Sequence, residues 1–236
     1  MNRLRPLRNM LPTADILHLV FPNLCLACER ELSRGEEHLC SFCQLELTPT
    51  RHRRSSDPTS VDQVFWGRVP VQATYAHYFF EKKKAVQNLL FSLKYGNNQE
   101  LGSFYGREIG KQLKNTTFAS ADALIPVPLH PRKEFLRGYN QSFLLAKGIS
   151  EILRVPVDAK TVARTRHTAT QTRKSRFQRW DNVHDIFSVK DAIKNYQHVV
   201  LIDDVITTGS TLESLIVSLR KKKPELSVSV VTLATA

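Results

Sequence analysis

The C-terminal two thirds of the chain alternates between short apolar runs and segments with an apolar residue every three or four positions. The short runs, rich in Val, Ile, Leu and aromatic residues, predict strands at 71–80, 123–127, 159–166, 184–189, 198–202 and 226–233. The periodic segments predict helices at 82–93, 101–113, 142–153 and 212–219. Strands that alternate with helices form an open, mostly parallel sheet, so the pattern predicts an α/β fold.

The apolar run VVLI at 199–202 is followed by polar residues of an unusual kind. The run is typical of a parallel strand buried on both faces, and it ends in Asp203 and Asp204. A turn of small residues and an apolar-periodic segment come next; the turn contains Thr207, Thr208, Gly209, Ser210 and Thr211. Backbone N–H groups at a helix N-terminus favour a phosphate. Two acids would repel that phosphate unless a ribose, bonded through its hydroxyls, lay between them.

This stretch therefore predicts a ribose 5-phosphate site at the carboxyl edge of a parallel sheet. The alternative is an ordinary strand-to-helix turn with a solvated acidic pair. A P-loop does not fit, because no Lys follows Gly209, and a dinucleotide fingerprint needs three spaced glycines. The order of apolar run, two acids and TTG-type loop resembles the signature for phosphoribosyl pyrophosphate (PRPP) in type I phosphoribosyltransferases. The resemblance implies these binding residues: Val205, Thr207, Thr208, Gly209, Ser210 and Thr211.

All four cysteines lie within nineteen residues, as two CxxC pairs separated by eleven residues: Cys25, Cys28, Cys40 and Cys43. Paired CxxC turns supply four thiolates to a closed tetrahedral Zn²⁺ site, so we expect structural zinc. Two disulfides are the alternative, and they require an oxidising compartment. His38 lies close enough to compete as a ligand, but with four cysteines present we interpret it as a surface residue.

The segment after the cysteines has a linker composition, rich in Arg, Ser, Thr, Asp and Pro over 48–63. We expect a zinc module at 1–48, a linker at 49–70 and an α/β domain at 71–236. No apolar run is long enough to span a membrane, and the N-terminus lacks the features of a signal peptide. The sequence thus favours a cytoplasmic protein.

Positive charge is concentrated in one part of the chain. The net charge is +12, and residues 130–180 hold twelve Lys/Arg against three Asp/Glu, whereas residues 1–60 are nearly balanced. A local excess of this size predicts an anionic partner such as a polyphosphate or a nucleic acid; a solvated basic surface is the alternative. The proline-rich loop PVPLHP is a plausible pyrophosphate site, and the basic segment 167–182 is either a closing loop or a plain surface loop.

Five motifs together resemble the ComF (ComF/GntX) family of competence proteins. They are FPNLCLACER with CSFC, LKYGN at 93–97, IPVPLHPRKEFLRGYNQS at 125–142, ARTRHTATQTRKSRFQRWDNV at 163–183 and VVLIDDVITTGSTL at 199–212. The resemblance implies a zinc finger joined to a type I phosphoribosyltransferase domain. It also implies the handling of single-stranded DNA in natural transformation, with other DNA-uptake proteins at the cytoplasmic face of the membrane as possible partners.

Three functions stay open on the sequence. In an enzyme that transfers phosphoribose from PRPP, Asp203 and Asp204 would hold the ribose and Mg²⁺ would bridge ribose and pyrophosphate. Arg137, or Arg164 and Arg166, would stabilise the leaving pyrophosphate. In a DNA-handling protein the PRPP site would be regulatory or vestigial. A purely structural zinc adaptor would leave the PRPP motif unexplained.

Overall fold

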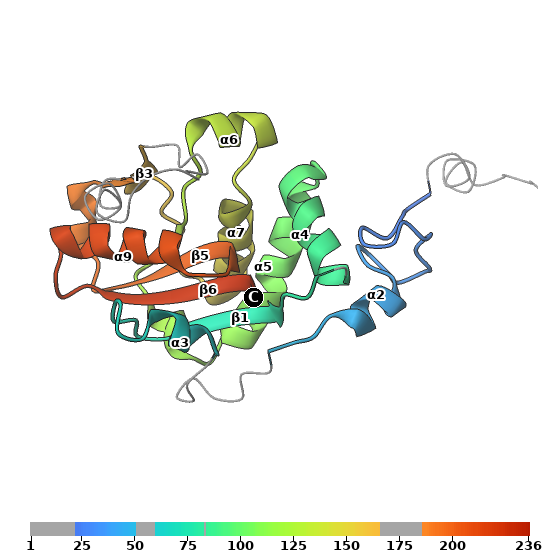
Figure 1. Cartoon of the computed structure of the whole chain (residues 1–236), viewed down its shortest axis with the longest axis horizontal. Helices are drawn as coiled ribbons and strands as arrows, with labels where there is room; N and C mark the ends of the chain where they lie inside the picture. The colour runs from blue at the N-terminus through green and yellow to red at the C-terminus, as the bar shows by residue number, and fades with distance from the viewer. Residues whose placement is uncertain (1–21, 51–59, 83, 166–185) are drawn as a thin grey trace, which may run out of the picture.

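The computed structural model describes residues 22–50, 60–82, 84–165 and 186–236. Its centre is a sheet of four parallel strands in the order β1-β6-β5-β2 (Figure 1). These strands are β1 (Thr74–Phe79), β2 (Ala123–Pro126), β5 (His198–Ile206) and β6 (Ser227–Thr235). The predicted α/β fold with a parallel sheet is confirmed.

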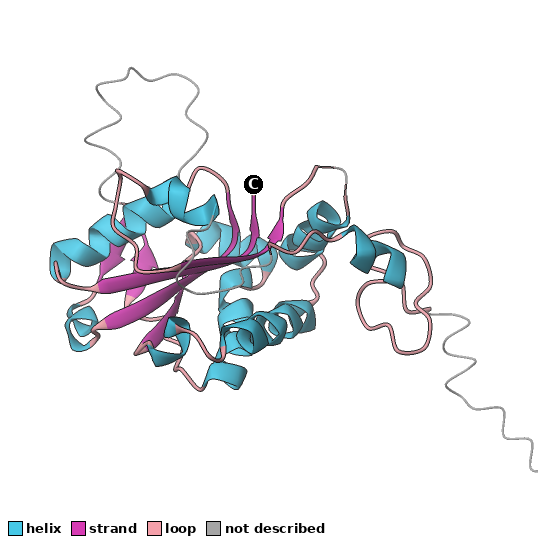
Figure 2. Cartoon of the chain, turned by 90° about the horizontal axis from the view of Figure 1, so that it is seen from below, coloured by secondary structure: helices cyan, strands magenta, loops and turns pink. Residues whose placement is uncertain are grey.

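Helices cover both faces of the sheet, because the strands are apolar on both faces (Figure 2). Val200 and Ile202 belong to one buried cluster, and the alternate residues Val199 and Leu201 belong to another. The first cluster includes α4 (Ala85–Tyr95), α5 (Gln99–Leu113) and α7 (Gln141–Leu153). The second includes α3 (Ser60–Phe65) and α9 (Ser210–Lys222). Polar groups that leave the strands at their carboxyl ends therefore meet at one edge.

The helices predicted at 82–93, 101–113, 142–153 and 212–219 correspond to α4, α5, α7 and α9. Helices α5 and α7 approach each other closely because glycines face one another. A Cβ atom at Gly148 would collide with the backbone oxygen of Ser103, and one at Gly106 would collide with that of Leu145. This close approach fixes where the N-terminus of α7 meets the sheet.

Two strands predicted from the sequence lie outside the main sheet. They are β3 (Val162–Arg164) and β4 (Phe187–Val189), which form a separate antiparallel pair. Residue 166, residues 184–185 and the basic segment 167–182 lie outside the described residues. The structure also contains two 3-10 helices in the described ranges, η1 (Thr117–Ser120) before β2 and η2 (Asp191–Asn195) before β5.

The strand before the acids is longer than predicted. It continues to Ile206, so Asp203 and Asp204 lie inside the strand rather than after it, with Asp203 paired to Thr232 and Val205 to Ala234. Ladder hydrogen bonds to β6 outweigh the low strand propensity of two aspartates. The acids are consequently held by the sheet and not by a turn.

Short helices at three places were not predicted. They are α2 (Ser41–Glu46), α3 and α6 (Pro131–Arg137). In α6, Pro131 stands in the first turn, the His130 side chain accepts from the N–H of Arg132, and Gly138 ends the helix with φ +78°. Pro at the start and Gly just past the end are ordinary helix signals, so the rigid loop expected around PVPLHP is shorter than predicted.

The segment expected to be a linker contributes to the fold. Thr48 accepts from the N–H of Phe79 at 2.9 Å and the N–H of Thr50 donates to His77 at 3.2 Å, so residues 48–50 cover the outer edge of β1. Further on, Val61 and Phe65 of α3 are buried in the second cluster. The division into 1–48, 49–70 and 71–236 stays a prediction, but the middle part is not a bare connector.

Candidate functional site

Asp204 is buried at the carboxyl edge of the sheet and has two partners from different helices. The Lys94 ammonium, at the end of α4, lies 3.2 Å from Asp204 Oδ2. The Gln141 amide, at the start of α7, donates to the same oxygen at 2.8 Å. A carboxylate is costly to bury unless it has a positive or hydrogen-bond-donating partner. Asp204 has one of each, Lys94 from α4 and Gln141 from α7.

Asp203 is held by weaker donors and carries an unusual pKa. Its Oδ1 accepts from Ser142 Oγ at 3.0 Å and from the N–H of Asp204 at 2.9 Å. Burial, together with the neighbouring Asp204 carboxylate, raises the pKa of Asp203 to about 7. The protonation state of Asp203 therefore changes near neutral pH, and an ionised Asp203 would gain from hydrogen bonds donated by a sugar.

A pocket lies directly beyond these acids, lined by Asp203 and residues 205–212. The chain turns at Gly209, whose φ of +70° favours glycine, and α9 begins at Ser210. The first N–H groups of a helix have no partner within the helix. The pocket thus combines backbone donors with the positive end of a thirteen-residue helix, which suits a phosphate.

Arg68, from the segment that follows α3, braces this loop from behind. One of its terminal nitrogens donates to the backbone oxygen of Thr208 at 2.6 Å, and the other pairs with Glu213 in the first turn of α9. In a trans peptide the C=O and N–H point in opposite directions, so the N–H of Gly209 points away from Arg68. A Cβ at Gly209 would lie 2.5 Å from Val64 Cγ1, which shows how closely α3 backs the loop.

The basic residues predicted to stabilise a leaving group are only partly placed near the acids. Arg137, the last residue of α6, lies over the Tyr95 ring at 5.2 Å, and Tyr95 follows the Lys94 that contacts Asp204. Arg164 lies over the Phe187 ring at 5.6 Å. Burial lowers the pKa of the Arg164 guanidinium, and the Asp203 carboxylate opposes this shift. Arg166 lies outside the described residues.

Sequence reasoning missed four residues of this edge, namely Arg68, Lys94, Gln141 and Ser142. Lys94 belongs to the motif LKYGN, and Gln141 and Ser142 belong to the motif GYNQS. Nothing in the spacing of these motifs indicates that the three residues lie near Asp203 and Asp204. Asn140 explains the placement of Gln141 and Ser142. Its side chain caps the start of α7 and donates to the backbone oxygen of Val127, in the loop after β2, at 3.1 Å.

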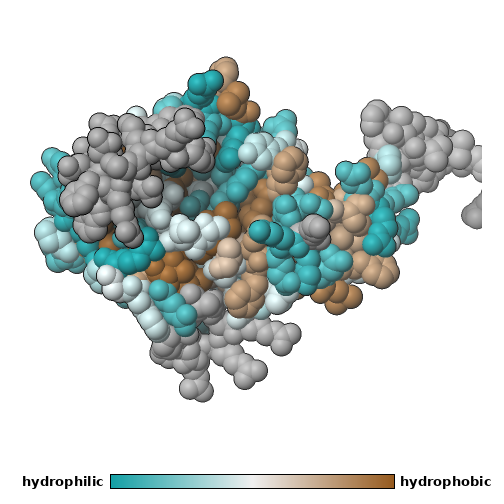
Figure 3. Space-filling model, in the orientation of Figure 1, coloured by the Kyte–Doolittle hydropathy of each residue, from teal (hydrophilic) through white to brown (hydrophobic). Residues whose placement is uncertain are grey.

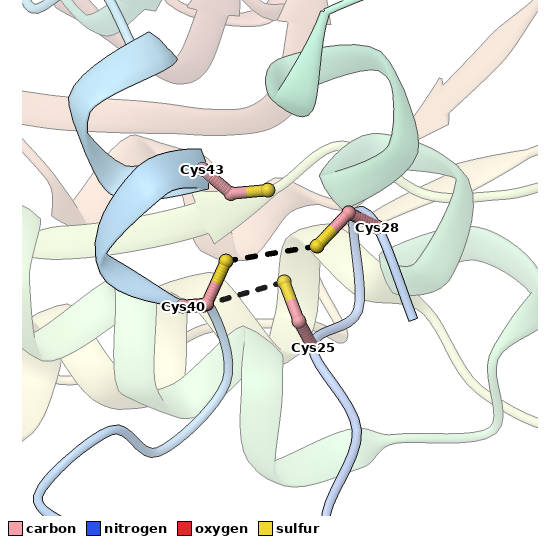
Figure 4. Close-up of side chains that lie close together, drawn as sticks. All are labelled: Cys25, Cys28, Cys40 and Cys43. Carbon is pink, nitrogen blue, oxygen red and sulfur yellow. Dashed lines mark hydrogen bonds between the residues drawn. The ribbon is translucent and has the colours of Figure 1, made fainter. Parts of the chain in front are cut away.

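The four cysteines come together as predicted (Figure 4). Their sulfur atoms all lie within 4.8 Å of one another, none forms a disulfide, and Cys28 Sγ and Cys40 Sγ are 3.6 Å apart. A tetrahedral zinc site with bonds of about 2.3 Å has sulfur–sulfur edges of about 3.8 Å. A backbone hydrogen bond from Arg30 lowers the pKa of Cys28 to about 6. Four sulfurs at this spacing fit a closed metal site, and His38 is not among them; its ring packs against Phe104.

The Cys cluster is attached to the helix that carries Lys94. Asn88 Nδ2 donates to the backbone oxygen of Ala27 at 2.6 Å, and Ser92 Oγ donates to that of Leu26 at 3.2 Å. Cys25, Cys40 and Cys43 share a buried cluster with apolar residues of α4. The first CxxC turn therefore rests on α4, the helix that ends at the acids.

Comparison with known proteins agrees with this architecture. A sequence model described as the phosphoribosyl transferase domain matches residues 140–236, and the parallel sheet with its acids and loop is that of a type I phosphoribosyltransferase fold. The DNA utilization protein YhgH of Shigella flexneri is 30% identical over 213 residues, which cover 84% of this chain and 90% of that protein. The chain belongs to the ComF family.

Two further similarities are weaker. Competence protein F of Haemophilus influenzae is 29% identical over 208 residues, covering 87% of each chain. Glutamine PRPP amidotransferase from B. subtilis has a TM-score of 0.41 at 19% identity, covering 61% of this chain and 30% of that one, which is too distant to support an argument. No helix in the described ranges is long and apolar enough to cross a membrane.

Proposed function

We propose that the protein binds PRPP with Mg²⁺ at the carboxyl edge of its sheet and acts in the handling of single-stranded DNA during natural transformation. The observation that carries the PRPP proposal is the position of Asp203 and Asp204, held in β5 directly before the phosphate-type pocket. Along the chain the two acids come first, then the pocket, then the N-terminus of α9. The ribose hydroxyls, the ribose ring and the 5′-phosphate of PRPP would bind to them in the same order.

Each group has a role that follows from its position. Asp203 and Asp204 accept hydrogen bonds from the ribose hydroxyls, and the loop from Thr207 to Thr211 donates to the 5′-phosphate. When bound, Mg²⁺ would neutralise charge on the pyrophosphate through hard oxygen ligands. Lys94 forms an ion pair with Asp204, and Arg137 supplies positive charge near the same edge.

We also propose that the metal held by the four cysteines is structural zinc. Four thiolates leave no open position for a substrate, which is the arrangement of structural sites. Thiolates that bind a metal are maintained in a reducing compartment, and on this ground we place the protein in the cytoplasm.

The DNA part of the proposal is supported by the names of two relatives, a competence protein and a DNA utilization protein, and by the charge of residues 130–180. If the protein binds about four phosphates, log K should fall with log salt at a slope of about −2.8. Charge reversal at Arg173, Arg176 and Arg179 should flatten the slope by about 0.7 for each phosphate that is no longer bound. Wild-type affinity and slope in that variant would show that these three residues do not bind DNA.

An active phosphoribosyltransferase is the second candidate. The network of Lys94, Gln141 and Ser142 around the acids favours it, because carboxylates held beside a pocket by specific charged and polar partners are typical of active sites. Release of pyrophosphate from PRPP in the presence of free nucleobases would establish it, and binding without release would leave the site regulatory.

Calorimetric titration of PRPP, with and without Mg²⁺, tests the binding site. Asp203→Asn with Asp204→Asn should weaken PRPP binding about 100-fold or more, because each acid contributes roughly 1.5–3 kcal/mol. Asp122→Asn is the matched control: Asp122 accepts from the backbone of His198 at the opposite end of β5. Unchanged PRPP affinity in a folded double variant would refute the assignment.

A further inference from the structure

Helix α4 exposes two aromatic rings beside the carboxyl edge of the sheet. Phe91 and Tyr95 are 64% and 59% exposed, whereas Leu89, Leu90 and Leu93 of the same helix are buried. The two rings stand one turn apart with their centroids 5.0 Å from each other. The core of the domain therefore does not account for them.

A cationic helix adjoins these rings. Arg137 of α6 lies 5.2 Å above the Tyr95 ring, and on the same short helix Phe135 and Leu136 are 87% and 74% exposed. Figure 3 shows apolar surface at the top of the molecule, where α6 lies, next to hydrophilic surface. Arg132 forms no ion pair with any carboxylate in the described part of the chain, and Lys133 likewise.

The surface adjoins the acids. Tyr95 directly follows Lys94, whose ammonium contacts Asp204, and Tyr139 after α6 donates to the backbone oxygen of Leu93 at 3.0 Å. The rings, the cations of α6 and the ribose acids thus share one side of the molecule.

We propose that Phe91, Tyr95 and Arg137 form a stacking surface for the bases of single-stranded nucleic acid, with Arg132 and Lys133 binding its phosphates. This rests on the DNA part of the proposed function and names where the strand lies. Aromatic rings interleaved with cations suit single strands, because every unpaired base offers a face for stacking and the backbone is anionic. A duplex hides those faces, and a purely apolar protein partner would leave the cations of α6 without counter-charges.

Two labelled probes of equal length separate stacking from charge: an oligothymidine of twenty nucleotides and its abasic counterpart. Phe91→Ala with Tyr95→Ala should weaken binding of the first about tenfold or more, and of the second less than about twofold. The slope of log K against log salt should stay as in the wild type, since the same phosphates remain bound. Phe91→Tyr with Tyr95→Phe should retain wild-type binding, because both rings remain.

Phe42→Ala is the matched control. Phe42 is 66% exposed in the Cys module, with Arg30 lying 4.8 Å over its ring, and its removal should leave both affinities unchanged. An equal fall in affinity for both probes in the Phe91/Tyr95 variant, or wild-type affinity for both, would overturn the stacking surface. If the wild type binds neither probe, the DNA part of the proposed function fails with it, whereas PRPP binding is unaffected.

A membrane surface is the competing partner for α6. If Phe135→Ala with Leu136→Ala abolishes sedimentation with phosphatidylglycerol vesicles while the Phe91/Tyr95 variant retains oligothymidine binding, the surface serves lipid and the proposal is wrong.

Discussion

The Cys cluster and the carboxyl edge of the sheet are assembled in opposite ways. The four sulfurs come from nineteen consecutive residues, so two tight turns and a metal suffice to bring them together. The groups around Asp203 and Asp204 come from α4, α7, β5 and the segment after α3, which are joined only by the folded domain. A change in the first site should stay local, whereas a change in the second should be felt through the elements that converge there.

Removal of the metal ligands should have the largest effect. Cys28→Ser with Cys40→Ser should abolish zinc, expected at one per chain, and unfold the module, because zinc supplies roughly 10–16 kcal/mol in small zinc domains. The α/β domain should stay folded, which metal analysis and thermal unfolding can establish. His38→Ala should keep full zinc; if it loses zinc as the cysteine variant does, the ligand set is wrong.

Removal of Arg68 should come next, and it tests whether the edge depends on a remote segment. Arg68→Ala should weaken PRPP binding by up to about tenfold, because the phosphate loop loses the hydrogen bond that holds Thr208 in place, and a hydrogen bond from a charged group contributes about 1.5–3 kcal/mol. Arg107→Ala, which removes an exposed pair with Glu151 at 3.4 Å, is the control and should bind normally. Calorimetry with ribose 5-phosphate and with pyrophosphate sharpens the result, because only the first should lose affinity.

Titration of Asp203 should produce a smaller effect with opposite signs for binding and stability. Its pKa of about 7 in the folded protein lies above the ordinary value of 3.8, so the folded state binds the extra proton between these values. The contribution of Asp203 to the stability of the ligand-free protein should therefore rise as pH falls from 7 towards 3.8, by at most about 1.4 kcal/mol per pH unit. Burial lowers the pKa of His38, His77 and His198 and acts in the opposite direction, so the measurement compares wild type with Asp203→Asn.

PRPP affinity should fall as pH falls through 7, because protonated Asp203 accepts a hydrogen bond from a ribose hydroxyl less well than the ionised carboxylate does. The difference between wild type and Asp203→Asn isolates this from titration of the ligand itself. Parallel pH profiles of the two proteins, in unfolding and in calorimetry, would contradict the shifted pKa.

The contact between the two regions should have the smallest effect. Asn88→Ala and Ser92→Ala each remove one hydrogen bond to the first CxxC turn, at a cost of about 1 kcal/mol apiece. Zinc content should not change, and PRPP affinity should change less than about threefold if the two sites are independent. A large fall in PRPP affinity would show that the module positions Lys94 through α4.

Sequence reasoning recovered most of what is local. The sequence predicted the strands of the parallel sheet, the four cysteines, the paired acids and the TTGST loop. Each of these features is a pattern of residues that are close together in the sequence. Lys94, Gln141 and Arg68 were not predicted, since only the packing of α4, α7 and α3 against the sheet brings them to the acids. The helix α6 is a different case: Pro131 and Gly138 signalled it, but three prolines within six residues were interpreted as a rigid loop.

Residues 48–50, which cover the outer edge of β1, protect the protein from aggregation. An uncovered parallel edge strand offers a row of free donors and acceptors to any other chain. On the other side of the sheet the segment around Val157 lies along β2, with the N–H of Asp158 donating to Leu124 at 2.9 Å. Both borders of the sheet are thus closed by irregular chain, and a protein shortened to begin at residue 71 would lose one of them. Such a fragment would also lack Val61 and Phe65 of the second buried cluster, so it should be less stable and should aggregate on concentration.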